Sequence, residues 1–167
     1  MSWRYQTHLP PGTYYASRRT EQPHLIFAEP HDYEEFEAFL AQTLDRTGTK
    51  LLAYCWMPAA IHLALTADQT PISDVMRRVT RYCTQQIQKR TGEKAIYTDS
   101  FPVMLLELET DLPRLLRYIH WIPVVAGVAA TPDEYPYSSH RAYARTSQSL
   151  PVHTTALQSL IHAPRVH

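Results

Sequence analysis

A run of basic and amide side chains between residues 72 and 90 is the best candidate for chemistry in this sequence. The segment holds five cations against one acid, Asp74, and so carries a net charge of +4. The five cations are Arg77, Arg78, Arg81, Lys89 and Arg90. In a helix, Arg77, Arg81 and Gln85 share one face because they are four residues apart. Guanidinium groups bind phosphate in a bidentate manner, so this face is either a phosphate-binding surface or an ordinary solvated helix face.

Two more arginines and several aromatic residues could extend such a surface. Arg18 and Arg19 come at the end of an aromatic segment that we predict to be a strand, 12–20. The aromatic residues that could stack on nucleic-acid bases are Tyr14, Tyr15 and Trp56. A place in the buried core is the commoner role for such side chains, and the sequence leaves both roles open.

The composition limits the classes of protein to consider. The chain has 167 residues, a length typical of one domain, and we expect a single domain over 1–167. Its 16 Lys plus Arg balance 16 Asp plus Glu, which excludes binding to DNA through bulk charge alone. The apolar fraction of 44% argues against disorder, and the longest apolar runs are far too short to span a bilayer. Since the first residues lack an apolar signal segment, we expect a cytoplasmic protein.

Hydrophobic periodicity predicts the elements that must position these residues. In chain order they are a strand at 12–20, a short strand or turn at 23–27, a helix at 32–47, a hairpin of strands at 50–56 and 60–66, a helix at 72–90, a strand at 102–109, and a helix at 112–122. Pro123 is expected to end the last helix. The pattern favours an α+β sandwich, an antiparallel sheet with helices packed on one face, followed by a tail that wraps the domain.

Three stretches of the sequence carry a family resemblance. They are YCWMPAAIHL at 54–63, RYIHWIPVVAG at 117–127 and DEYPYSSHRAY at 133–143. In order and spacing they resemble the tyrosine transposases associated with repetitive extragenic palindromes, which belong to the single-strand transposases with a His-hydrophobic-His metal motif. The resemblance covers about residues 10–145 and leaves 146–167 as a C-terminal tail. It implies a ferredoxin-like fold and cleavage of single-stranded DNA beside a hairpin.

The resemblance also implies a mechanism. A helical tyrosine attacks the scissile phosphate and becomes a 5′-phosphotyrosine, leaving a free 3′-OH. Mg²⁺ or Mn²⁺ is held by two histidines at i and i+2 on a strand, which point to the same side. The third ligand is an amide four residues after the tyrosine, on the same helix face. The metal neutralises charge in the transition state, which a tyrosine with a pKa of about 10 needs at neutral pH.

Carried over residue by residue, the resemblance places Tyr118 at the nucleophile and His62 at the second histidine. The first histidine's position is Ala60, and the amide's position is Ile122. Because neither side chain has a metal-binding atom, two of the three protein ligands are missing, and we expect metal binding to be weak or absent. Substitute ligands are conceivable in Glu107, Glu109 and His120. We expect the glutamates to face solvent along a strand and His120 to face away from Tyr118.

Three functions remain open on the sequence alone. The first is a transposase-like protein that binds single-stranded or hairpin DNA, with impaired catalysis, through Arg18, Arg19 and the basic side chains of 72–90. The second is an active tyrosine transposase with a rearranged metal site around His62. The third is a protein-interaction module on the same scaffold, which the neutral net charge favours. A homodimer is compatible with all three.

Overall fold

The structure is a computed structural model that describes residues 9–98, 103–144 and 150–157, and four strands in these ranges form one antiparallel sheet. The strands are β1 (Gly12–Arg19), β2 (Lys50–Met57), β3 (Ala60–Ala67) and β4 (Val103–Leu105). Their order across the sheet is β2-β3-β1-β4, which with the intervening helices is the split βαβ arrangement of the ferredoxin-like fold. The α+β class and the antiparallel sheet expected from the sequence are confirmed.

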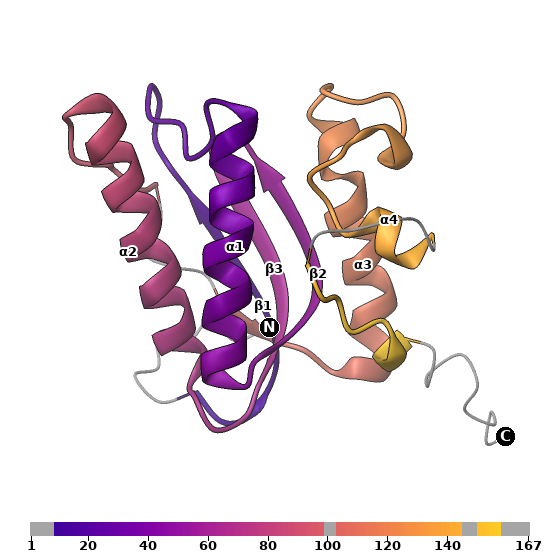
Figure 1. The fold of residues 1–167 in the computed structure, drawn as a ribbon. Coiled ribbons are helices and arrows are strands. Elements are labelled where there is room, and N and C mark those ends of the chain that lie inside the picture. The colour runs from indigo at the N-terminus through magenta and orange to yellow at the C-terminus, as the bar shows by residue number, and fades with distance from the viewer. Residues whose placement is uncertain (1–8, 99–102, 145–149, 158–167) are drawn as a thin grey trace, which may run out of the picture.

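Two long helices lie side by side on one face of this sheet (Figure 1). They are α1 (Pro30–Thr47) and α2 (Ile72–Thr91). Phe36 of α1 and Val79 of α2 are fully buried in the same cluster as Ile61 of β3. Both helices end at a glycine with a left-handed backbone, Gly48 at φ 65° and Gly92 at φ 75°. Other residues rarely adopt this conformation, which explains why the sequence indicated both ends.

The third long helix, α3 (Leu108–Val125), covers the opposite face of the sheet. Leu112 and Ile119 of α3 are buried with Cys55 of β2 and Ala64 of β3. The expectation of helices on one face therefore holds for α1 and α2 but not for α3. The physical reason is that β2 and β3 are buried along nearly their whole length, so both faces of the sheet need a cover.

The structure decides one open alternative and corrects the predicted bounds of α1, β4 and α3. Residues 23–27, expected to be a short strand or a turn, form a turn region. Helix α1 begins at Pro30, two residues before the predicted start, and Asp32 lies inside its first turn, where its carboxylate accepts the N–H of Glu29 at 3.0 Å. Strand β4 ends at Leu105, well short of residue 109, and α3 begins at Leu108. Helix α3 also continues past Pro123, because proline removes only its own N–H and that of Ala126 still donates to Ile122.

The segment that follows α3 lies along the outer edge of β2 and includes two short helices, η1 (Pro132–Glu134) and α4 (His140–Tyr143). The N–H of Trp56 donates to the carbonyl of Tyr137 at 2.8 Å, and Ser139 donates to Tyr54 at 3.0 Å. The hydroxyl of Tyr143 donates to the carbonyl of Leu52 at 2.6 Å. This confirms a wrapping segment after α3; most of 146–167 lies outside the described residues. Among the described helices, none combines the length and hydrophobicity needed to cross a membrane.

Candidate functional site

Tyr118 and His62 lie on the face of the sheet that α3 covers, and Tyr15 connects them. His62 sits in β3 opposite Ser17 of β1. The hydroxyl of Tyr15 is 2.8 Å from Nδ1 of His62, and their rings stack with centroids 6.2 Å apart. The ring of Tyr15 also meets that of Tyr118 edge-on, again at 6.2 Å. The structure thus brings together the two residues that the motifs singled out.

The two residues differ sharply in their access to solvent. Tyr118 is 56% exposed, whereas His62 is 6% exposed. Burial, and next the positive charge of Arg19, lower the pKa of His62 to about 4. The imidazole is therefore neutral at pH 7 and holds one hydrogen, on one of its two ring nitrogens. Tyr118 is therefore accessible from solvent, whereas His62 is enclosed by the protein.

Tyr15 is a residue of this site that the sequence did not assign to it. Burial, and after it the neighbouring Tyr118, raise the pKa of Tyr15 well above its ordinary value, against the opposing influence of Ser17 and Arg19. Tyr15 therefore keeps its hydroxyl hydrogen at neutral pH and can donate it to Nδ1 of His62. The sequence signal was present, because alternate residues of a strand share a face and β1 adjoins β3 in this fold. By the same alternation Tyr14 points to the other face and is fully buried.

The donor atoms at this site do not fit a divalent cation. Ala60 lies two residues before His62 in β3, 5% exposed, and carries only a methyl group. Ile122 lies one helical turn after Tyr118 and packs with its alkyl chain against the core beneath α3. His62 is the single imidazole left from the expected ligand set. Among the described residues no group of three or more His, Cys, Asp or Glu side chains could hold a metal ion.

Of the substitute ligands considered from the sequence, His120 has its partners elsewhere, and the two glutamates belong to the start of α3. Nε2 of His120 is 2.8 Å from the hydroxyl of Ser139, and its ring contacts that of His140 edge-on at 5.2 Å. Burial, with a smaller effect of His140, lowers the pKa of His120 to about 4. Glu107 precedes α3 as its N-cap and Glu109 lies in the first helical turn. The expectation that these two glutamates alternate along a strand is therefore wrong.

The basic residues expected to bind nucleic acid divide between the two faces of the sheet. Arg19 is exposed on the face of the sheet that α3 covers, where its positive charge helps to lower the pKa of His62. Arg18 points the other way, and its guanidinium lies 4.0 Å from the ring centroid of Tyr97. Strand alternation separates these sequence neighbours.

The basic residues of α2 lie on the opposite side of the sheet from Tyr118. Arg77, Arg78, Arg81 and Lys89 are exposed. Arg77 pairs with Asp74 at 2.7 Å, and Arg90 pairs with Asp32 of α1 at 3.2 Å. Arg90 also donates to the carbonyl of Leu25. Arg90 thus connects the end of α2 to the start of α1.

The order of the elements and the placement of an exposed helix tyrosine beside a strand histidine agree with the tyrosine transposases that the motifs resemble. The sequence matches the family described as "Transposase IS200 like" over residues 19–121, more than half of the chain. This protein therefore belongs to the IS200-like transposase family.

One solved structure supports the same fold. The structure of a REP-associated tyrosine transposase bound to a REP hairpin matches with a TM-score of 0.69 at 17% identity, covering 92% of this chain and 96% of that one. A candidate transposase from Deinococcus radiodurans R1 matches with a TM-score of 0.47 at 17% identity, covering 70% of this chain and 94% of that one. No curated protein sequence shows a significant match.

Proposed function

We propose that this transposase-family protein binds single-stranded or hairpin DNA on the face that carries Tyr118, and that it has lost metal-dependent cleavage. The observation that carries the proposal is an exposed Tyr118 in a site where two of the three metal-ligand positions, Ala60 and Ile122, have no metal-binding side-chain atoms. The structurally similar REP-associated transposase was solved with a REP hairpin, which supports DNA as the partner. Arg19 adds a positive charge on the same face.

The loss of cleavage follows from what the remaining groups can do. Attack on a phosphodiester needs a phenolate or a base for the phenol proton, and it needs compensation of the charge that develops on the phosphate oxygens. The neutral His62 supplies no positive charge, and its Nδ1 is taken by the Tyr15 hydroxyl. Tyr118 then serves as a contact to DNA through its ring and hydroxyl.

The test separates binding from covalent chemistry. A pool of hairpin-flanked single-stranded oligonucleotides is incubated with the protein and Mn²⁺, and the bound DNA is divided into a salt-released and a detergent-resistant fraction. We expect salt-released DNA alone. A detergent-resistant fraction that disappears with EDTA and in Tyr118→Phe would show an active transposase, and a His62→Ala titration with Mn²⁺ would then locate its metal. If neither fraction forms, the protein does not act on such DNA, and a protein-interaction module becomes the better hypothesis.

A gain-of-ligand variant tests the reason for the loss. Ala60→His with Ile122→Asn returns an imidazole and an amide to the two ligand positions, next to His62. We expect this double variant to bind Mn²⁺ and to form a Tyr118-dependent covalent adduct with DNA. The matched control is Ala60→His with Ile122→Leu, which has a similar volume but lacks the third donor. Equal Mn²⁺ affinity of the two variants would argue against missing ligands as the cause.

A further inference from the structure

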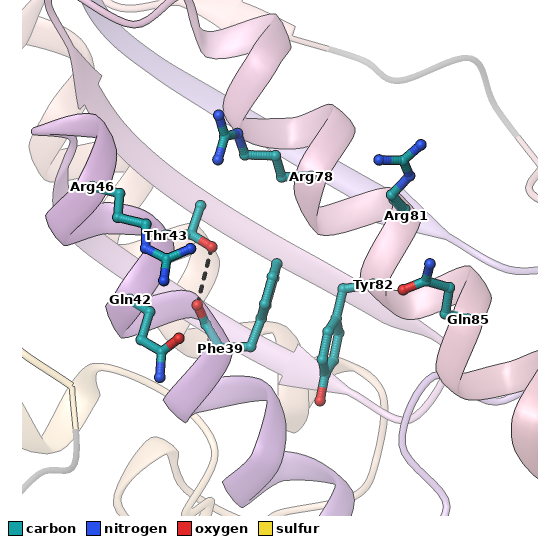
Figure 2. Close-up of a pocket in the computed structure, with 8 residues that line it drawn as sticks. All are labelled: Phe39, Gln42, Thr43, Arg46, Arg78, Arg81, Tyr82 and Gln85. Carbon is teal, nitrogen blue, oxygen red and sulfur yellow. Dashed lines mark hydrogen bonds between the residues drawn. The ribbon is translucent and has the colours of Figure 1, made fainter.

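A cavity of about 310 Å³ opens between α1 and α2, on the side of the sheet opposite to Tyr118 (Figure 2). The residues that line it are Phe39, Gln42, Thr43 and Arg46 of α1 and Arg78, Arg81, Tyr82 and Gln85 of α2. The lining holds three guanidinium groups and two primary amides, and it includes no carboxylate. We call it the α1–α2 groove.

Both walls of the α1–α2 groove follow the same helical spacing. On each helix the four lining residues stand at i, i+3, i+4 and i+7, so they form one stripe about 10 Å long. Between the stripes the rings of Phe39 and Tyr82 stack at 4.1 Å and 12°. Arg46 of α1 and Arg78 and Arg81 of α2 line the same cavity as this aromatic pair (Figure 2).

The arginines of the α1–α2 groove differ from other arginines of α2 in their pairing. Within the described part of the chain, no ion pair or hydrogen bond engages the guanidinium of Arg46, Arg78 or Arg81. Arg77 and Arg90, outside the groove, are both paired with aspartates. Two carboxylates that affect the pKa of Tyr82, Asp32 and Glu35, line a separate cavity. The positive charge of the groove is therefore not neutralised by its own lining.

We propose that the α1–α2 groove binds the phosphate backbone of single-stranded DNA, as a second contact surface away from Tyr118. Planar guanidinium groups bind phosphate oxygens through paired hydrogen bonds, and the amides of Gln42 and Gln85 add donors and acceptors. An acidic protein segment would meet the same charges, but membership of a transposase family favours DNA. This inference rests on the proposed DNA-binding function and adds a location to it.

The test measures fluorescence anisotropy of a labelled oligothymidine of about 20 nucleotides over a series of NaCl concentrations. In Arg46→Gln/Arg81→Gln we expect affinity at 50 mM NaCl to fall about tenfold or more. The slope of log K against log salt should become shallower by about 1.4, or about 0.7 for each lost phosphate contact on a single strand. Lys50→Gln/Lys94→Gln removes the same charge at exposed sites outside the groove and should change affinity by less than about twofold.

A single carboxylate provides a second test without removing any arginine. Gln42→Glu places a negative charge in the groove, and Gln88→Glu places one on the exposed surface of α2 outside it. Of these two variants, we expect only Gln42→Glu to weaken DNA binding, by about threefold or more at low salt. Thermal unfolding followed by circular dichroism should give the same Tm for both variants and the parent.

The other possible results of these binding tests each contradict at least one of the two proposals, the groove or the DNA-binding function. If the parent binds DNA and Arg46→Gln/Arg81→Gln binds equally well, the groove is not a DNA site and the proposed function survives. If the lysine control weakens binding as much, diffuse charge explains the effect and the groove proposal fails. If polyglutamate displaces the DNA at equal charge concentration, the groove is better suited to an acidic protein. If the parent does not bind DNA at all, both proposals fall.

Discussion

Two of the buried histidines, His62 and His120, predict that acid begins to destabilise this protein well above the pH at which carboxylates titrate. His62 and His120 are 6% and 7% exposed, and burial lowers the pKa of each to about 4. In the unfolded chain both return to about 6.5. Since the unfolded state then binds more protons than the folded one, the free energy of unfolding decreases as pH falls from about 6.5 to about 4.

The size of the effect follows from the same values. In the middle of this window each histidine contributes a slope that approaches about 1.4 kcal/mol per pH unit. Between pH 7 and pH 5 this amounts to about 2 kcal/mol for each histidine and about 4 kcal/mol for both. A total stability of about 5–15 kcal/mol is usual for a domain, so the loss is a large share of the whole.

The assay is urea unfolding in the presence of EDTA at pH 7, 6 and 5, on the parent, His62→Asn and His120→Gln. Asn can replace Nδ1 of His62 in the contact with Tyr15, and Gln can replace Nε2 of His120 in the contact with Ser139. We expect each variant to lose about half of the pH dependence of the parent, about 2 kcal/mol between pH 7 and 5. A variant with the full dependence of the parent would show that its histidine is protonated in the folded protein.

The remaining predictions concern the start of α1, the core and the site. Asp32→Ala should lower the free energy of unfolding by about 1–2 kcal/mol in urea, because its carboxylate accepts two backbone N–H groups and pairs with Arg90; no change would contradict this. Trp56→Ala should cost about 3–5 kcal/mol, since Trp56 is fully buried, and a loss below about 1 kcal/mol would refute the packing argument. Tyr118→Phe should unfold within about 0.5 kcal/mol of the parent, because the side chain is largely exposed; a larger loss would indicate a structural hydrogen bond. Mn²⁺ at about 1 mM should leave Tm unchanged to within about 1 °C, and a rise that EDTA reverses would reveal a metal site.

The sequence predicts the long elements well because their signals are local. Gly48 and Gly92 mark the ends of α1 and α2, where a left-handed residue is required. The boundary between β4 and α3 has no such local signal, because the alternating residues 103–109 resemble a continuing strand. The N–H of Leu106 still bonds to Thr13 of β1, and the chain then turns into α3, where the carboxylate of Asp111 accepts the N–H of Glu107. The first of these contacts links residues more than 90 positions apart, which local periodicity does not contain.

The site shows the same division between local and distant information. Tyr118 and His62 could be identified from short motifs, whereas Tyr15 lies 47 residues from its partner His62. Its role depends on the register in which β1 pairs with β3, where Tyr15 faces Ala64 and Ser17 faces His62. Without that register, strand alternation shows only that Tyr15 lies on one of the two faces of the sheet, and does not show which residue it contacts.

Charge along the sequence is an equally incomplete guide to charge on the surface. The net charge of +4 over 72–90 suggests one uniform basic helix face. In the folded protein Asp74 pairs with Arg77, and Asp32, which belongs to another helix, pairs with Arg90. Of the three cations that remain on α2, Arg78 and Arg81 join Arg46 of α1 in the groove, and Lys89 lies outside it. A surface suited to phosphate is thus made by two helices together, and the composition of either helix alone does not reveal it.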